Sequence, residues 1–136
     1  MAAMDPRASR IAPSLSDIEW LAERALATIP KSLKRHLRNL VIRVDELPDE
    51  EVEEEMELES PFDILGLYRG VALPRKSVGD VRPDADMVFL YRRPILDYWC
   101  ETGEDLYRVV RHVLIHEIGH HFGFSDEDME RLEEEA

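Results

Sequence analysis

His116-Glu117-Ile118-Gly119-His120 lies near the C-terminal end of this 136-residue chain, within the longer string HEIGHHFGFSD. On an α-helix, residues four positions apart lie one turn above each other on the same face. His116 and His120 can therefore bind one metal ion, and Glu117, one position round the helix, faces a water molecule on that ion. The stretch predicts a helix that carries a metal site.

A third ligand is expected just after this helix. Catalytic zinc sites take three protein ligands and leave a fourth position for water. Gly123 allows the backbone to reverse, which returns Asp126 towards the ion. We expect His116, His120 and Asp126 to bind Zn2+. A glutamate on a more distant helix is less well placed, because the chain ends at residue 136. Two acidic neighbours of Asp126 are alternatives to it, Glu127 and Asp128.

Glu117 is the candidate general base. Zinc lowers the pKa of its bound water towards neutrality, and a nearby carboxylate can take the proton and pass it to a leaving amine. Two histidines and one aspartate also match the facial triad of non-haem iron oxygenases. Those ligands usually lie on strands and need no glutamate between the histidines, so the pattern favours zinc.

Other polar side chains are candidates for the surroundings of the site. His112 lies one turn before His116 on the same face, which fits either a role beside the ligands or substrate, or a surface histidine. Tyr68, Tyr91 and Tyr107 are candidate oxyanion donors, and the sequence does not choose between them. Glycine in a helix interior is less favourable than alanine by about 1 kcal/mol. We therefore expect Gly119 to leave room for a neighbour, which could be a strand, a substrate or a packed side chain.

The chain is strongly acidic. It has 30 Asp and Glu against 17 Lys and Arg, which gives a formal net charge of −13. This charge repels nucleic-acid phosphates and anionic membrane surfaces, so we expect neither as a partner. Cys100 is the only cysteine, which fits a reducing compartment. The sequence lacks a secretory signal and a long apolar run, and we expect a cytoplasmic protein.

Hydrophobic periodicity predicts helices and strands in alternation. Ser16 and Glu19 form a capping box before a helical pattern that stops at Pro30. A second short helix is expected over 31–39, and three stretches are predicted to be strands: 40–44, 61–73 and 87–91. Gly66 and Gly70 mark bends or close backbone approach. The acidic block 45–59 favours a loop or an exposed helix over a charged lid above the site.

The longest helix is expected over 103–122, with Thr102 and Asp105 at its start and Gly123 at its end. Its apolar stripe consists of Leu106, Val109, Val110, Val113, Leu114 and Ile118. The preceding apolar stretch 95–99 is too short to favour helix or strand, 74–83 reads as a loop, and a final acidic helix is expected over 126–135. Residues 1–13 read as a flexible lead-in and 14–136 as a single α+β domain, with one sheet covered by helices.

The string HEIGHHFGFSDEDMERL, preceded by DLYRVVRHVLI, resembles the small bacterial zincin-like metallopeptidases. The segments PFDILGLYRGVALP and MVFLYRRPIL also resemble that family, so the likeness covers most of 16–132. The resemblance implies a minimal zincin fold, with a small mixed β-sheet packed against an active-site helix and a backing helix. It implies His116, His120 and Asp126 as zinc ligands and Glu117 as base. It also implies a peptide or unfolded protein segment as substrate, paired with the LGLYRG or VFLYRR strand.

The sequence departs from larger zincins in ways that leave other functions open. Relatives of the metzincin type carry a third histidine at the position of Asp126 and a methionine turn well downstream, whereas Met129 follows Asp126 by only three residues. A zinc-dependent metallopeptidase is the favoured hypothesis. Two alternatives stay open: a metal-binding interaction module with little or no catalysis, and a zincin-like hydrolase acting on RNA, against which the net charge argues.

Overall fold

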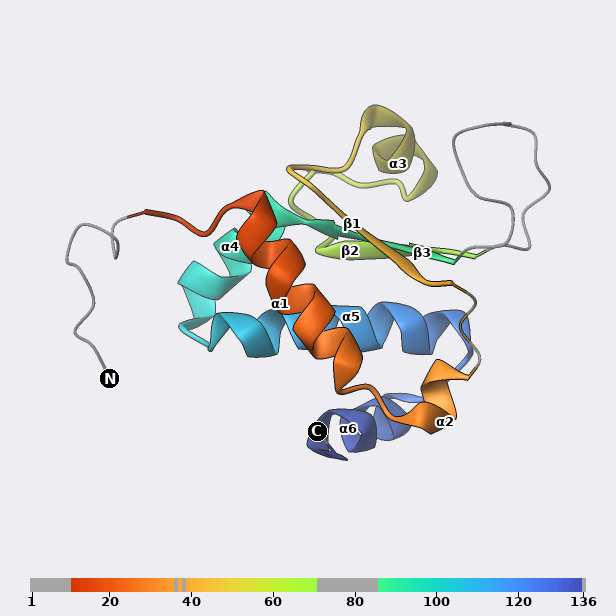
Figure 1. Ribbon diagram of the computed structural model, residues 1–136. Coiled ribbons are helices and arrows are strands. Elements are labelled where there is room, and N and C mark those ends of the chain that lie inside the picture. Colours follow the sequence, from red (N-terminus) through yellow and green to blue (C-terminus); the bar gives the residue numbers. More distant parts are fainter. Residues whose placement is uncertain (1–10, 36, 38, 71–85, 136) are drawn as a thin grey trace, which may run out of the picture.

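The computed structural model describes residues 11–35, 37, 39–70 and 86–135. A small β-sheet lies between two layers of helices (Figure 1). One face is covered by α1 (Leu15–Ala27) and by α5 (Leu106–His121), and the short acidic helix α3 (Glu50–Glu55) lies over the other face. The helix α6 (Asp126–Glu135) packs against α5 on the side away from the sheet.

The sheet is mixed and has three strands in the described residues. Its order is β1 (Val41–Asp45), β3 (Met87–Tyr91) and β2 (Gly66–Arg69). β1 runs parallel to β3, and β2 runs antiparallel to it with Gly66 opposite Leu90. β3 is therefore central, and β2 has β3 as its only described neighbour. β2 is shorter than the predicted strand 61–73 at its start, because residues 61–65 form turns and loop, and residues 71–73 of that prediction lie outside the described part of the chain.

α5 is the centre of the hydrophobic core. Its predicted apolar stripe is buried apart from Leu106, which is only partly covered. α5 packs against α1, which contributes Ile18, Ala22 and Ala25, and against the buried side chains Val88 and Leu90 of β3. The core therefore fixes the inner face of α5 and leaves its polar face towards solvent.

Helix ends differ from the sequence prediction at two places. The capping box of α1 is formed by Ser14 and Asp17, two residues before the predicted Ser16 and Glu19. The N-cap of α5 is Asp105, three residues after the predicted cap Thr102. Thr102, however, belongs to a separate helix α4 (Arg92–Thr102), which starts directly after β3 and ends at Gly103 with φ +70°. The undecided stretch 95–99 is thus helical.

The second short helix, α2 (Lys31–Lys34), lies within the predicted range 31–39. The predicted final helix coincides with α6, and Gly123 before it has a left-handed φ of +76°. Most of the lead-in 1–13 and the loop 74–83 lie outside the described residues. Over the described chain, no helix combines the length and the apolar character needed to cross a membrane. The α+β class and the mixed sheet packed on a long helix are confirmed.

Candidate metal and active site

Three histidines line the solvent-facing side of α5 at successive turns. The ring centroids of His112 and His116 lie 4.0 Å apart, and those of His116 and His120 lie 5.6 Å apart at an interplanar angle of 87°. Burial, and then the neighbouring His112, lower the pKa of His116 below its usual value. This shift favours the neutral form of His116, which is the form in which an imidazole binds a metal ion.

Glu117 lies between α5 and the strand β2. A Cβ added at Gly66 would lie 2.8 Å from Val113 Cγ1 and 3.4 Å from Glu117 Cγ, so the glycine allows the strand to pass close above the helix. This confirms the expectation of close backbone approach at Gly66. Burial raises the pKa of Glu117 to about 7, although a hydrogen bond from the backbone N–H of Tyr68 acts in the opposite direction. A carboxyl group with a pKa near 7 suits proton transfer at neutral pH.

A cleft of about 610 Å³ opens beside the histidines. His112, His116, Glu117 and His120 form one wall, and residues 63–67 of the segment leading into β2 form the opposite wall. Most of the remaining lining is apolar and consists of Met56, Val109 and Val113. The cleft is therefore lined both by the histidines of α5 and by apolar side chains.

The third predicted ligand, Asp126, is the first residue of α6 and is exposed. Its charge acts to raise the pKa of His116 against the larger effect of burial. Asp128, one of the alternatives, accepts a hydrogen bond from the Ser125 backbone N–H, while its own N–H donates to Ser125 Oγ at the start of α6. Asp128 also pairs with Arg131. Glu127 is exposed. Of these three acidic residues, Asp126 is the one whose charge acts on His116.

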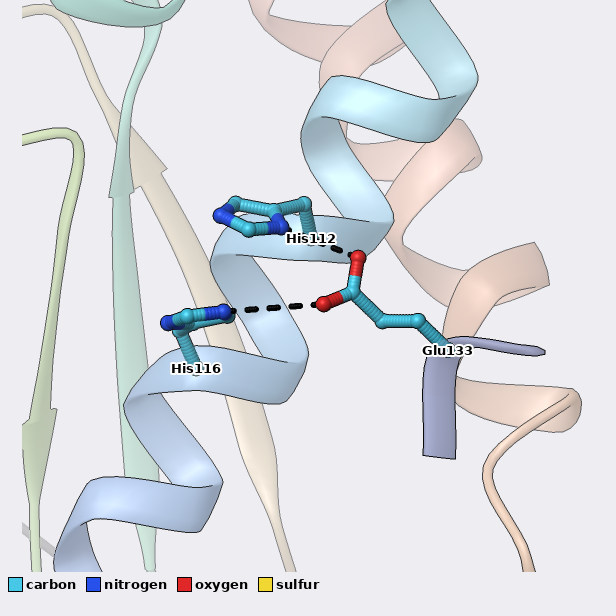
Figure 2. A group of neighbouring side chains, drawn as sticks. All are labelled: His112, His116 and Glu133. Atoms are coloured by element: carbon cyan, nitrogen blue, oxygen red, sulfur yellow. Dashed lines mark hydrogen bonds and ion pairs between the residues drawn. The ribbon is translucent and has the colours of Figure 1, made fainter. Parts of the chain in front are cut away.

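A different carboxylate, that of Glu133, lies beside His112 and His116 on α5 (Figure 2). Its Oε1 is 2.9 Å from His112 Nδ1, and its Oε2 is 3.5 Å from His116 Nε2. These three side chains are the group in the described residues whose metal-binding atoms lie within 4.8 Å of one another. The group contains neither His120 nor Asp126. The sequence analysis missed Glu133, although it follows the buried Met129 by four residues and so shares its helix face.

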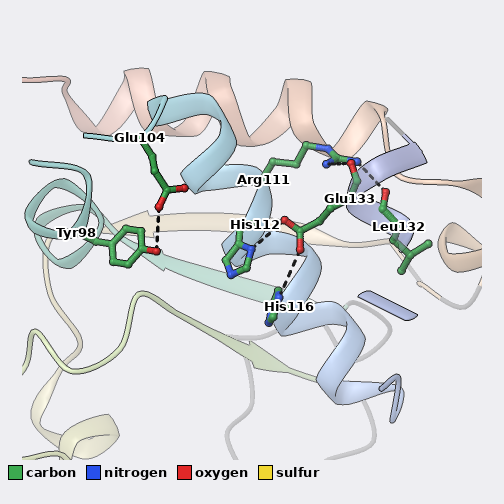
Figure 3. A network of polar contacts seen from close by, with 7 residues as sticks. All are labelled: Tyr98, Glu104, Arg111, His112, His116, Leu132 and Glu133. Carbon is green, nitrogen blue, oxygen red and sulfur yellow. Dashed lines mark hydrogen bonds and ion pairs between the residues drawn. The ribbon is translucent and has the colours of Figure 1, made fainter. Parts of the chain in front are cut away.

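The position of Glu133 is fixed by a buried arginine (Figure 3). Arg111, only 8% exposed, donates hydrogen bonds from its two terminal nitrogens to the carbonyl oxygens of Glu133 and Leu132, at 2.8 and 3.1 Å. Its Nε donates to Thr28 Oγ1 at 3.0 Å. Arg111 thus satisfies free carbonyl groups at the end of α6 and joins that end to α5 and to the residue that caps α1.

The tyrosines predicted as oxyanion donors do not line the cleft. Tyr68 stacks on His121 at 4.0 Å near the end of α5, and burial followed by the adjacent Asp86 raises its pKa. Tyr91 lines a smaller cavity with Asp45 and Arg69, and burial raises its pKa to about 12. Tyr107 packs against the core.

The tyrosine in the cleft is Tyr98 of α4. Its hydroxyl donates to Glu104 Oε2 at 3.2 Å, and this hydrogen bond raises the pKa of the phenol (Figure 3). The sequence analysis missed Tyr98 because the conformation of 95–99 was undecided. The sequence signal that could have identified it is the position of Tyr98 just before the helix that carries the histidines.

The acidic block 45–59 consists mostly of loop and of the short exposed helix α3, as the sequence favoured, and only Val52 of α3 is buried. Glu55 accepts two hydrogen bonds from Arg69 at 3.1 and 2.6 Å, which join α3 to β2. Met56, at the end of α3, lines the cleft. The block therefore contributes an apolar side chain to the cleft while its carboxylates stay in solvent.

The donor set fits a zinc ion. His116 and His120 lie one turn apart with their rings edge to face, and the acidic residues Asp126 and Glu133 of α6 lie near His116. Neutral imidazoles with one carboxylate are a common ligand set in catalytic zinc sites.

Comparison with known proteins agrees with this arrangement. The chain matches the family described as zincin-like metallopeptidase over residues 37–136, which include β1 to α6 and the whole cleft. A search of curated proteins found no match. The family match covers most of the chain, and the protein therefore belongs to the zincin-like metallopeptidase family.

Proposed function

We propose that the protein is a zinc-dependent peptidase that hydrolyses peptides or unfolded protein segments with Glu117 as the general base. The observation that carries this proposal is the position of Glu117. Its side chain lines the same cleft as His116 and lies close to Gly66 of β2, and burial raises its pKa to about 7. A carboxyl group in that environment can accept and release a proton near neutral pH.

The zinc ligands in this proposal are His116, His120 and Asp126. Zinc held by them would activate a water molecule and polarise the scissile carbonyl group. Glu117 takes a proton from the attacking water and later gives it to the leaving amine. Its hydrogen bond with the Tyr68 backbone N–H holds the carboxylate beside β2.

β2 is the strand proposed to hold the substrate. β3 is paired on both sides, by β1 and by β2, so the VFLYRR segment has no free edge for a peptide. The LGLYRG segment contains β2, whose outer edge has no strand partner in the described chain. An extended peptide can add to such an edge through main-chain hydrogen bonds, independently of its sequence.

The cleft supports a preference for apolar side chains. Met56, Val109 and Val113 line it close to the histidines. Glu104 and Asp63 are the acidic residues at its margin, and they oppose a phosphate backbone. The charge around the cleft therefore argues against the RNA hydrolase alternative and is compatible with a peptide.

A peptide library tests the proposal. Wild type and Glu117→Gln, both loaded with zinc, are incubated with a mixture of peptides, and new termini are identified by mass spectrometry. The proposal expects cleavage next to apolar residues by the wild type and none by Glu117→Gln at equal zinc content. Equal cleavage by both proteins removes Glu117 from the mechanism, and no cleavage by either favours the interaction-module alternative.

A further inference from the structure

His112 and Glu133 lie outside the HExxH motif and are not used by the proposed mechanism. Together with His116 they form a compact group of metal-binding side chains. We infer that His112, His116 and Glu133 form a second position for a divalent metal ion, one helical turn from the HExxH pair, with His116 shared between the two positions.

The distances support this assignment. Two ligands bonded to a tetrahedral zinc ion at its usual bond lengths lie about 3.4 Å from each other. His116 Nε2 and Glu133 Oε2 are already 3.5 Å apart. His112 Nδ1 is within hydrogen-bond distance of the other carboxylate oxygen, and its side chain is 49% exposed, so its ring is free to turn towards an ion.

The carboxylate is held in place by the fold. The hydrogen bonds from Arg111 to the carbonyl oxygens of Leu132 and Glu133 fix the backbone of α6 against α5. Glu133 then reaches the histidines with a side chain that is only 24% exposed (Figure 3). A carboxylate fixed in this way loses little conformational entropy when it binds a metal ion.

The two positions exclude each other. His116 Nε2 can bind one ion at a time, so an ion held with His112 and Glu133 takes His116 away from His120. An ion that moves between the two positions keeps His116 as a ligand and exchanges its other protein ligands.

Zinc affinity of His120 variants tests this inference. His120→Ala removes the HExxH pair but leaves the second position intact. It is compared with His120→Ala/His112→Ala and His120→Ala/Glu133→Gln by competition with a chromophoric zinc chelator. The matched control is His120→Ala/Glu134→Gln, because Glu134 is an exposed glutamate next to Glu133 on the same helix.

We expect His120→Ala and the control to bind about one zinc ion per chain. Each of the other two double variants should bind zinc roughly tenfold or more weakly. His120→Ala that binds no zinc, or double variants that bind as tightly as His120→Ala, would overturn the inference. Arg111 contacts only backbone atoms of Glu133, so Glu133→Gln keeps the helix in place, and circular dichroism checks this.

The outcome is separable from that of the proposed function. The second position is detected by metal binding alone, so it stands even if no peptide is cleaved. Conversely, cleavage that depends on Glu117 supports the peptidase proposal even if His120→Ala binds no zinc.

Discussion

Gly119 of α5 lies directly against Met129 of α6. A Cβ added at Gly119 would lie 2.5 Å from Met129 Sδ and 2.8 Å from Met129 Cγ. Of the two explanations that the sequence left open for this glycine, the structure supports the packing contact rather than space for a strand or substrate. The glycine allows α6 to approach α5 closely, and α6 carries both Asp126 and Glu133. Gly119 therefore helps to position the candidate carboxylates.

Gly119→Ala should destabilise the protein. The added methyl group forces Met129 aside, and overpacking of this kind typically costs about 1–3 kcal/mol. The higher helix propensity of alanine offsets about 1 kcal/mol of that loss. Urea denaturation measures the difference in the free energy of unfolding.

Met129→Ala provides the control for this contact. In the Met129→Ala background, Gly119→Ala should be neutral or stabilising, because the side chain that it displaces is gone. Equal destabilisation in both backgrounds would show that the contact with Met129 is not the cause.

Arg111→Met should loosen α6. The substitution keeps much of the side-chain volume but removes the hydrogen bonds to Thr28, Leu132 and Glu133. Unpaired buried carbonyl groups each cost about 1–3 kcal/mol, although those at the end of α6 regain some contact with water. We expect a loss of about 2 kcal/mol in unfolding free energy and faster amide exchange in α6. Arg108→Met, at an exposed position on the same helix, should change neither quantity.

Glu117→Gln should stabilise the metal-free protein at neutral and alkaline pH but not at acidic pH. Folding raises the pKa of Glu117 from 4.5 to about 7. The folded state therefore binds more protons than the unfolded state between these values, and stability falls as the pH rises from 4.5 to 7. At pH 8 the raised pKa of Glu117 lowers the free energy of unfolding by at most about 3 kcal/mol relative to acidic pH. Thermal unfolding in the presence of a chelator should give a higher Tm for Glu117→Gln at pH 8 and nearly equal values at pH 4. A Tm difference that does not depend on pH would contradict this account.

Tyr98→Phe should lower peptidase activity without changing zinc content. Tyr98 is the tyrosine that lines the cleft, and its hydroxyl is held by Glu104. A phenol that stabilises developing charge on the substrate acts mainly on kcat, and we expect a decrease of roughly tenfold or more. Tyr107→Phe, which alters a residue packed against the core, is the control. An unchanged kcat in Tyr98→Phe would exclude this role.

The sequence was sufficient to predict α5 and its buried face. The apolar stripe from Val109 to Ile118 repeats at helical spacing, and Gly123 supplies the left-handed residue that ends the helix region. The spacing of His116 and His120 follows directly from the helical repeat. Elements and contacts that depend on a regular period were therefore predictable.

Contacts between elements were not predictable in the same way. α4 begins immediately after β3, with Pro94 in its first turn, where the missing N–H removes no helical hydrogen bond. From the sequence alone, the stretch 95–99 was too short to assign to a helix or a strand. Glu133 reaches the histidines only because Met129 and Arg111 fix α6 against α5. These contacts join residues of different helices, and a local hydrophobic pattern does not show which helices pack together.

Metal content of the purified protein is the most direct test of the central claim. Elemental mass spectrometry is applied to wild type, to His116→Ala and to His121→Ala, whose histidine stacks on Tyr68 outside the cleft. Because His116 belongs to both metal positions, we predict about one zinc ion per chain in wild type and in His121→Ala, and none in His116→Ala. Wild type that binds no zinc when zinc is offered in excess, or His116→Ala that binds as much as wild type, would contradict the account.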